Sequence, residues 1–304
     1  MKDLESKVAV ITGGAAGIGR EIALRFGQEG MKLVLADVEA TVLEATVKEL
    51  NERSIDAIGV VTDVAKLESV EALRDATLDA YGAVHVVCNN AGVGGGGGGH
   101  AWEHEMNDWR WAFDVNVLGV VHGINAFVPV LVAQDVEAHV INTSSHNGGF
   151  FPLPSTAIYA ATKASVVTIT EVLWAQLREI DSKVGASVLF PSGRSPGILN
   201  TGIWNSGRNR PAEYAQQNPR EEPAGSALEK YKKAMEAAGR PVVFADLSEI
   251  ADQVVEGIRA DQFWIHPPSD LHDASILERA ESMVARGTPD YMLARLDPPR
   301  TPKQ

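Results

Sequence analysis

Short β-branched runs alternate with longer helical patterns along most of this 304-residue chain. The runs are typical of buried strands and cover Val8–Thr12, Lys32–Ala36, Ala57–Val61, Val84–Cys88, His139–Asn142, Ser187–Phe190 and Phe263–His266. The helical patterns between them cover Ile18–Gln28, Val38–Arg53, Val70–Tyr81, Asn107–Val132, Ala157–Asp181 and Leu247–Arg259. Such alternation predicts a parallel sheet with helices on both faces. Because crossovers are right-handed, we expect one α/β fold with a doubly wound, Rossmann-like sheet of about seven strands.

Two segments interrupt this alternation. Gly94–Gly99 is a run of glycines and predicts a flexible loop after the fourth strand. Ile203–Pro241 is rich in proline and charge and has one helical piece, Ala227–Ala238. Loops of this length are unusual unless they are functional. We therefore expect residues 203–241 to close over a bound substrate as a lid.

The alternation continues unbroken to the last predicted strand, so one domain is favoured over the two that length alone suggests. We expect a catalytic domain over residues 1–268, with the insertion inside it, and a C-terminal helical extension and tail over residues 269–304. The extension has one helical pattern, Ala274–Arg286, followed by a proline-rich end. With 45% hydrophobic residues, the chain has ample material for a large core.

The charge and the cysteine content limit which partners and which cellular compartment we expect for this chain. The formal net charge of -13 argues against nucleic acid or an anionic membrane as a partner. We find no run of 18 apolar residues, so no transmembrane helix is expected. The start of the chain goes straight into a strand-like run without a signal-peptide pattern. The single Cys88 rules out an internal disulfide and suits a cytoplasmic location.

A glycine turn separates the first predicted strand from the first helix. Gly13, Gly17, Ile18 and Gly19 give the spacing G-x-x-x-G-x-G. Such a turn lets backbone N–H groups approach a pyrophosphate at the helix N-terminus. A tight structural turn is the alternative, but the position directly after the first buried strand favours a dinucleotide site.

Asp37 ends the second predicted strand. A carboxylate there can accept both hydroxyls of an adenosine ribose and would repel a 2′-phosphate. It can also cap the next helix, and both roles can hold at once. Neither Ala15 nor Ala16 is basic, although Arg20 is near, so NAD is favoured over NADP. Asp63, after the third strand, either lies near the adenine or caps a helix, and the two interpretations are evenly balanced.

Tyr159 and Lys163 stand four residues apart in a helical pattern. On a helix such a pair shares one face, about 5–6 Å apart. A neighbouring ammonium favours the phenolate, so we expect a lowered tyrosine pKa and proton exchange near neutral pH. The spacing alone is also typical of a surface pair. The glycine turn and Asp37 favour the chemical role.

Taken together, these pieces resemble the short-chain dehydrogenase/reductase family over roughly residues 5–267. The motifs that carry the resemblance are Thr12-Gly-x-x-x-Gly17-Ile-Gly19, Asp63, Asn89-Asn-Ala-Gly92, Asn116, Ser145, Tyr159-x-x-x-Lys163 and Pro196-Gly-x-x-x-Thr201. Each is weak by itself, but their order along the chain is specific. The resemblance implies NAD(P)-dependent oxidation or reduction at a carbon that bears oxygen, with no metal in the site.

Residue by residue, the resemblance implies a catalytic set. Tyr159 would be the general acid/base, Lys163 its activator, and Ser145 the group that binds the substrate oxygen. Asn116 would support a water that relays protons to Lys163. The implied cofactor-binding residues are Gly13, Gly17, Ile18, Gly19, Asp37, Asp63, Val64, Asn90, Ala91, Gly92, Tyr159, Lys163 and Thr201. Among them, Asn90 would brace the cleft and Thr201 would touch the nicotinamide carboxamide.

The chain departs from the family pattern in two places. The interval from Ser145 to Tyr159 is about one residue longer than expected, and His146 and Asn147 follow the serine where small residues are usual. Either can contact substrate, although a solvated loop histidine is favoured. A short insertion, Pro191–Ser195, precedes the Pro-Gly pair near the nicotinamide, which makes Thr201 a less secure assignment.

Loop composition suggests the substrate, and helix composition suggests the assembly. Five apolar side chains of the loops around the expected pocket favour an apolar or aromatic alcohol or ketone, namely Phe150, Phe151, Leu153, Ile203 and Trp204. The helices Asn107–Val132 and Ala157–Asp181 are apolar enough to pack on a second subunit, as is common in the family, so we expect a homodimer or homotetramer. The alternative is burial against their own sheet, for Val166, Val167, Ile169, Leu173 and Trp174.

The sequence therefore predicts hydride transfer between NAD(H) and a secondary alcohol or ketone. A catalytically idle NAD-binding sensor or scaffold is a second possibility, which the complete Asn116, Ser145, Tyr159 and Lys163 set disfavours. A third is an NAD-dependent epimerase or dehydratase. The chain has no room for the substrate domain of those longer relatives.

Overall fold

The computed structural model describes residues 1–296, apart from 97–98, 195–196, 219–226, 238 and 240–241. One parallel sheet of seven strands runs through it in the order β3-β2-β1-β4-β5-β6-β7. The strands are β1 Val8–Thr12, β2 Lys32–Asp37, β3 Ala57–Val61, β4 Val86–Asn89, β5 Ala138–Thr143, β6 Val184–Leu189 and β7 Trp264–Ile265. The predicted doubly wound α/β fold is confirmed, and the strand positions differ from prediction by a few residues at most.

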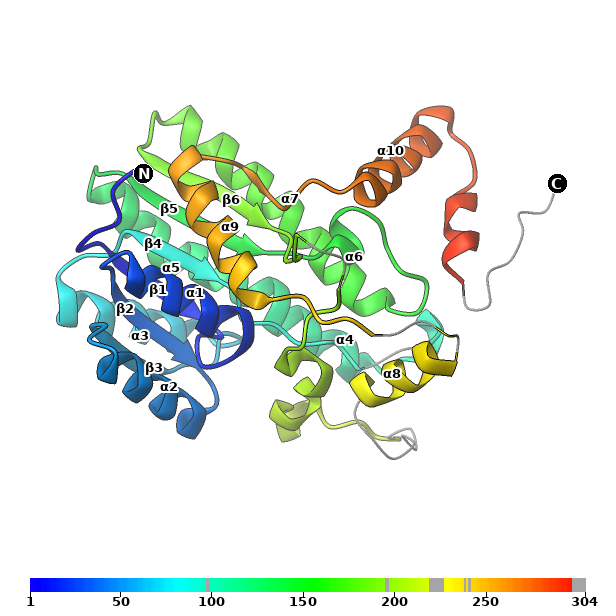
Figure 1. Ribbon diagram of the computed structural model, residues 1–304, viewed down its shortest axis with the longest axis horizontal. Helices are drawn as coiled ribbons and strands as arrows, with labels where there is room; N and C mark the ends of the chain where they lie inside the picture. Colours follow the sequence, from blue (N-terminus) through cyan, green and yellow to red (C-terminus); the bar gives the residue numbers. More distant parts are fainter. Residues whose placement is uncertain (97–98, 195–196, 219–226, 238, 240–241, 297–304) are drawn as a thin grey trace.

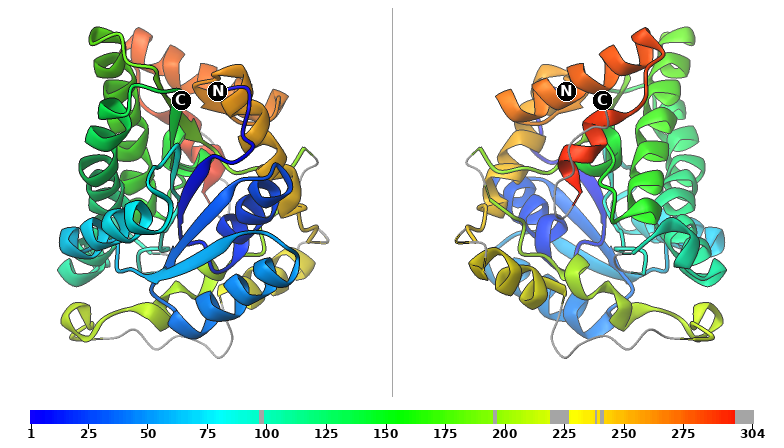
Figure 2. Two further views of the ribbon diagram at one scale, coloured as in Figure 1. Left: turned by 90° about the vertical axis from the view of Figure 1, so that its left-hand side faces the viewer. Right: turned by 90° about the vertical axis from the view of Figure 1, so that its right-hand side faces the viewer.

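Helices cover both faces of the sheet, as Figure 2 shows. They are α1 Gly17–Gln28, α2 Ala40–Glu52, α3 Leu67–Tyr81, α4 Met106–Phe113, α5 Gly119–Ala133, α6 His146–Gly149, α7 Ala157–Glu179, α8 Ala227–Ala237, α9 Leu247–Ala260 and α10 Asp270–Ala285. Side chains from α1, α2 and α9 build the core on one face, and side chains from α3, α5 and α7 build it on the other. The result is a three-layer α/β/α sandwich.

Strand β1 shows why these sequences form a central strand. Ala9 and Ile11 face the α1–α9 core, whereas Val8 and Val10 face the α3–α5 core. Successive side chains of a strand point to opposite faces, so a strand buried on both sides is apolar throughout. Every residue of β1 is buried.

The strand order reverses between β1 and β4. From β1 the chain crosses outward to β2 and β3, then returns to place β4 on the other side of β1 (Figure 1). In open α/β sheets the crevice at this switch point, beyond the carboxyl ends of the strands, is where ligands bind. The glycine turn after β1 and Asn90 after β4 both open into it.

The helix predicted over residues 107–132 changes its helical geometry in the middle. α4 and α5 are joined by a π-helical turn, Asp114–Leu118, and the run from Met106 to Ala133 is continuous. Its most apolar 18-residue window has a mean hydropathy of 1.9, so this helix, in which polar residues break the apolar run, is apolar enough to cross a membrane. By length and composition alone this is weak support for a membrane span, because Phe127 and Leu131 of this helix are core residues beneath the sheet.

Part of the predicted lid is docked on α4. Residues Gly202–Asn209 and Ala212–Tyr214 form 3-10 turns, and helix α8 follows. The Arg210 guanidinium is 2.7 Å from the buried Asp108 carboxylate, and the Tyr214 hydroxyl donates to Asp114 at 2.7 Å. Residues 219–226, 238 and 240–241 of the predicted lid, and 97–98 of the glycine run, lie outside the described residues.

The chain ends in an arm. Helix α10 is followed by a 3-10 turn, Asp290–Arg295, and we call residues 270–295 the C-terminal arm. The predicted extension helix therefore exists but begins four residues earlier, at Asp270. Ser269 is its N-cap and accepts a hydrogen bond from the backbone N–H of His272.

Candidate active site

The loops after β1 and β4 are joined by a short network around Thr12. Its hydroxyl oxygen accepts the backbone N–H groups of Asn90, at 2.9 Å, and Ala91, at 3.1 Å. In return, the Asn90 amide donates to the Thr12 carbonyl at 3.0 Å. These bonds fix the two walls of the switch-point crevice relative to each other. Asn90 thus links the loop after β4 to the loop after β1.

The glycine turn leaves no room for side chains. A Cβ atom at Gly19 would lie 2.1 Å from the Gly13 carbonyl oxygen, and Gly13 and Gly17 have φ values of 63° and 55°. Among the described residues, no side chain caps the first turn of α1 at Ala16. An uncapped helix N-terminus approached by bare backbone is what a pyrophosphate needs. A Cβ at Gly17 would lie 3.4 Å from the Thr201 side chain, which places Thr201 at this turn.

Asp37 lies against the glycine turn at the end of β2. Its carboxylate accepts the backbone N–H groups of Ala15 at 3.2 Å and Glu39 at 3.1 Å. Burial raises the pKa of Asp37, and those N–H donors oppose the shift. Arg20, the nearby base, is instead held by the Glu49 carboxylate in a two-point ion pair at 2.6 and 2.7 Å. The ribose end of the cleft is therefore acidic.

Asp63 and Val64 have local structural roles. The Asp63 carboxylate accepts the N–H of Ala65 at 3.1 Å, as a turn residue ahead of α3. The Val64 side chain is buried, and a Cβ at Gly119 of α5 would approach it to 2.9 Å. Asp63 therefore closes a turn ahead of α3, whose N-cap is Lys66 without a side-chain cap, so neither of the two interpretations of Asp63 is established by these contacts.

Tyr159 and Lys163, in the first turns of α7, lie near Ser145, which follows the carboxyl end of β5. The Lys163 ammonium is 5.7 Å from the centre of the Tyr159 ring and donates to the Thr143 carbonyl at 2.9 Å. Ser145 is next to the phenol and forms a hydrogen bond with it, which opposes part of the rise that burial causes in the tyrosine pKa. Of the three adjacent hydroxyls, Ser144 is buried and donates to the Lys163 carbonyl at 2.7 Å. The geometry therefore singles out Ser145.

The expected lowering of the Tyr159 pKa is wrong for this structure. Burial of the phenol raises its pKa, and the opposing effect of Ser145 is smaller. Burial also lowers the pKa of Lys163 to about 8. The ammonium points at the Thr143 carbonyl instead of the phenol oxygen, so it does not offset the desolvation of its neighbour.

Asn116 lies in the π-helical turn and faces the cleft. Its side-chain oxygen accepts the Val93 N–H at 2.7 Å, and its amide donates to the Val93 carbonyl at 2.9 Å and to Thr162 at 3.0 Å. A Cβ atom at Gly92 would lie 3.2 Å from the Asn116 oxygen and 3.4 Å from the Lys163 nitrogen. The bare glycine thus keeps a small space between these two groups, where a relaying water would have to sit.

The two residues after Ser145 are partly buried and contact other side chains. The His146 ring packs on Phe150 and on His272 of the C-terminal arm, with ring centres 5.1 and 3.8 Å apart. The favoured interpretation of His146 as a solvated loop residue is wrong. Asn147 is used within the loop, because its amide donates to Thr156 at 2.7 Å.

The five apolar side chains expected around the pocket separate into two groups. Phe150 is buried against Phe190 and belongs to a small core cluster, so its assignment to the pocket is wrong. Phe151 lies under the Arg295 guanidinium. Leu153 is 37% exposed, and Ile203 and Trp204 are partly exposed on the insertion.

The insertion crosses the cofactor cleft. The Ser206 hydroxyl accepts the N–H of Gly94 at 2.9 Å, and Asn209 donates to Glu39 at 2.8 Å. Arg208 forms an ion pair with the same carboxylate. Residues 201–209 therefore contact the glycine turn, the loop after β4 and the ribose end. Ser195, the last residue of the short insertion, and Pro196 of the Pro-Gly pair lie outside the described residues.

Sequence reasoning missed several residues that hold this site. Thr162 supports Asn116, and a buried chain of polar groups runs from Asn89 to Asn142 at 2.8 Å and on to Thr170 at 3.0 Å. A polar residue in an otherwise apolar strand or helix is the signal that could have found them, because buried polar groups need partners. Arg208 and Glu39 gave no such signal, since both look like ordinary surface charges.

The fold and this site define an oxidoreductase that uses a nicotinamide dinucleotide. The described residues fit the cofactor, with an uncapped helix end and an acidic ribose pocket in one crevice. A model of the family described as short chain dehydrogenase matches residues 7–208, and the chain belongs to the short-chain dehydrogenase/reductase family.

Three comparisons illustrate the relationship. A short-chain dehydrogenase/reductase from Burkholderia phymatum in complex with NAD is 36% identical, with a TM-score of 0.83 over the full length of both chains. The 1-deoxy-11-beta-hydroxypentalenate dehydrogenase of Streptomyces exfoliatus is 38% identical over 62% of this chain and 67% of its own. Actinorhodin polyketide ketoreductase with NADPH is 27% identical, with a TM-score of 0.67 over 85% of this chain and 92% of its own. Members of the family thus bind either dinucleotide.

Proposed function

We propose that the protein transfers a hydride between NAD(H) and a secondary alcohol or ketone, with Tyr159 as general acid/base. The observation that carries the proposal is the meeting of the Tyr159 phenol and the Ser145 hydroxyl beside the buried Lys163. Two hydroxyls that converge on one oxygen atom can stabilise the charge that develops there. The partly exposed Leu153, Ile203 and Trp204 support an apolar or aromatic substrate.

In this mechanism the nicotinamide, when bound, supplies the site that accepts or gives the hydride. In the reductive direction, Tyr159 keeps its proton because burial raises the phenol pKa, and it donates that proton to the carbonyl oxygen. Ser145 donates a hydrogen bond to the same oxygen. Lys163, with a pKa of about 8, can return a proton to Tyr159 from the space beside Asn116. In the oxidative direction the proton follows the same route in reverse.

The proposal is tested by incubating the purified protein with NAD and a panel of aryl and aliphatic secondary alcohols while NADH absorbance is recorded. Turnover of at least one alcohol is expected. An idle sensor would bind NAD without turnover, and an epimerase or dehydratase would convert its substrate with no net NADH. Either result would count against the proposal.

We also propose NAD as the preferred cofactor. Asp37→Ser is expected to weaken NAD binding about 10- to 100-fold, because it removes a charged acceptor from the ribose hydroxyls, and to improve NADP binding relative to NAD. Titration calorimetry with each dinucleotide measures both effects. Glu44→Gln removes an exposed charge from α2 and serves as the control. An unchanged NAD to NADP affinity ratio in Asp37→Ser contradicts the assignment.

A homodimer or homotetramer in the cytoplasm is a further part of the proposal. Of the side chains that were expected to need a partner, Val166, Val167 and Leu173 are buried in their own core, whereas Trp174 stays 41% exposed. Only 39% of the most apolar window of Met106–Ala133 is buried. The net charge of -13 disfavours nucleic acid as a partner.

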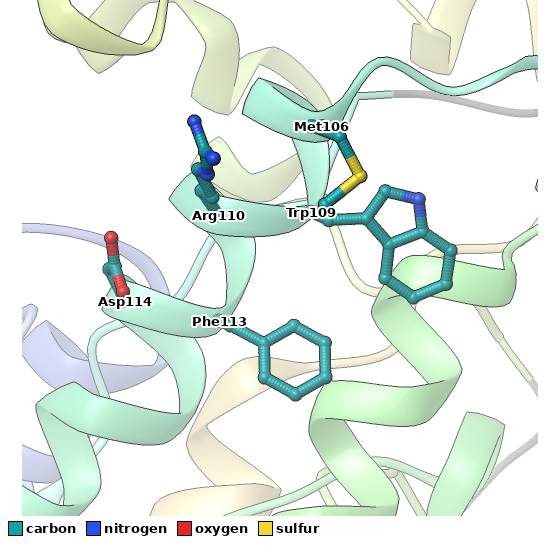
Figure 3. Close-up of a pocket in the computed structure, with 5 residues that line it drawn as sticks. All are labelled: Met106, Trp109, Arg110, Phe113 and Asp114. Atoms are coloured by element: carbon teal, nitrogen blue, oxygen red, sulfur yellow. The ribbon is translucent and has the colours of Figure 1, made fainter.

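The outer face of α4 adds to this apolar surface. It holds a shallow hollow, in which Trp109 and Phe113 lie on one side of the helix and Arg110 and Asp114 on the other (Figure 3). Met106, at the start of the hollow, is 64% exposed. Light scattering at micromolar concentration is expected to give a mass well above the 32.5 kDa of one chain. A mass of 32.5 kDa refutes the oligomer.

A further inference from the structure

The loop that follows Ser145 has an irregular backbone. Asn147 has a ψ of 104° and Gly148 a φ of 103°, so the chain leaves helical geometry within α6. Carbonyl groups in such a turn lack regular helical partners and need donors from elsewhere. The carbonyl oxygens of Gly148 and Phe150 each accept a hydrogen bond from Nη1 of Arg279, at 3.4 and 3.0 Å. Arg279 belongs to the C-terminal arm.

The arm touches the same loop at two more points. The His272 ring packs on His146 in a tilted arrangement, and the Arg295 guanidinium lies 4.7 Å from the centre of the Phe151 ring. Burial, with His272 and His266 nearby, lowers the pKa of His146 to about 3, and burial lowers that of His272 as well. The two imidazole rings are therefore neutral at pH 7 and do not repel each other.

These contacts connect the arm to the site. Figure 1 shows α10 beyond the carboxyl ends of the strands, beside α6. The matched part of the family model ends at residue 208, so the arm is not part of what defines the family. We propose that Arg279 is a positioning residue, which holds the Ser145 hydroxyl against Tyr159 through the carbonyls of Gly148 and Phe150. The inference rests on the proposed function only for the role of Ser145.

The path from Arg279 to Ser145 is short. The Ser145 carbonyl accepts the N–H of Gly149 at 3.0 Å, and the Ser145 hydroxyl oxygen accepts the N–H of Asn147 at 3.2 Å. Gly148 lies between these two donors. A cationic donor gives stronger hydrogen bonds than a neutral one, so Arg279 can fix this turn from outside. Without it, two carbonyl groups of the turn lose their outside donor, so the turn shifts more easily and carries the serine with it.

Hydrogen exchange tests the positioning without any substrate. In Arg279→Ala, the amides of residues 146–151 are expected to exchange at least about tenfold faster than in the wild type, because their local opening becomes easier. Arg279→Lys, which keeps one charged donor, should recover part of the protection. Arg286→Ala, an exposed arginine at the end of α10, is the control. Unchanged exchange in a normally folded Arg279→Ala protein, checked by thermal unfolding, overturns the proposal.

Kinetics test whether the effect passes through Ser145. With the best alcohol or ketone of the panel, Arg279→Ala should lower kcat about 10- to 100-fold, the range a small misplacement produces, and leave the KM for NAD unchanged. In a Ser145→Ala background, Arg279→Ala should change kcat less than about twofold, because coupled residues are not additive. Equal losses in both backgrounds overturn the proposal. If nothing in the panel is turned over, the proposed function fails, and hydrogen exchange decides the role of Arg279 alone.

Discussion

Replacing Tyr159 by phenylalanine is expected to lower kcat about 10²- to 10⁴-fold, the range that general acid–base groups contribute. The phenol hydroxyl forms a hydrogen bond with Ser145 at the site, and phenylalanine keeps the ring while removing the proton donor. Lys163 should stay in place, because its ammonium is held by the Thr143 carbonyl and not by the phenol oxygen. NAD affinity should therefore remain close to that of the wild type.

Steady-state kinetics and calorimetry together measure this prediction. Tyr81→Phe is the matched control, since Tyr81 also donates its hydroxyl to one partner, Asp56 at 2.8 Å, but lies at the end of α3. It should leave kcat unchanged. Activity of Tyr159→Phe near that of the wild type would count against the proton-transfer mechanism. A loss of NAD affinity equal to the loss in kcat would show that the residue mainly binds cofactor.

Replacing Gly19 by alanine is expected to abolish measurable NAD binding. The added Cβ would lie 2.1 Å from the Gly13 carbonyl oxygen and 2.9 Å from the Asn90 amide nitrogen. The nearest of these atoms belongs to the backbone, so the glycine turn must move away from α1. Overpacking of this kind costs about 1–3 kcal/mol of folding stability, so a lower unfolding temperature is expected as well.

Calorimetric titration with NAD and thermal unfolding separate the two effects. Gly287→Ala is the control, because the nearest atom to its new Cβ is 3.8 Å away and the residue is exposed beyond α10. Its NAD affinity and unfolding temperature should match the wild type. If Gly19→Ala bound NAD normally, the turn could not be the phosphate site.

Much of the fold was predictable because strand and helix periodicities are local properties of the sequence. The apolar run of β1 and the glycines after it are patterns of neighbouring residues. They were therefore enough to predict a buried strand of the sheet and the first cofactor loop. The spacing of Tyr159 and Lys163 likewise placed both on one face of α7. The π-helical turn at Asn116 was not predictable, because one extra residue in a helical turn leaves the apolar pattern almost unchanged.

The pKa of Tyr159 is a property that the spacing of residues in the sequence did not predict. Two residues four apart in sequence predict proximity, but the direction of a pKa shift depends on burial and on where each charge finds its partner. The Lys163 ammonium donates a hydrogen bond to the carbonyl oxygen of Thr143, which is 20 residues away in sequence. The predicted solvation of His146 failed for the same reason, since its neighbour His272 comes from the far end of the chain.

The amino-acid order alone predicted a doubly wound sheet and a dinucleotide crevice at its switch point, and it named the groups that we propose to move a proton. Tertiary structure alone decided which of those groups are desolvated, that residues 201–209 cross the crevice, and that the C-terminal arm contacts the loop after Ser145. The reason is physical: periodicity records which face of an element is buried, whereas contacts between loops distant in sequence leave no periodic trace.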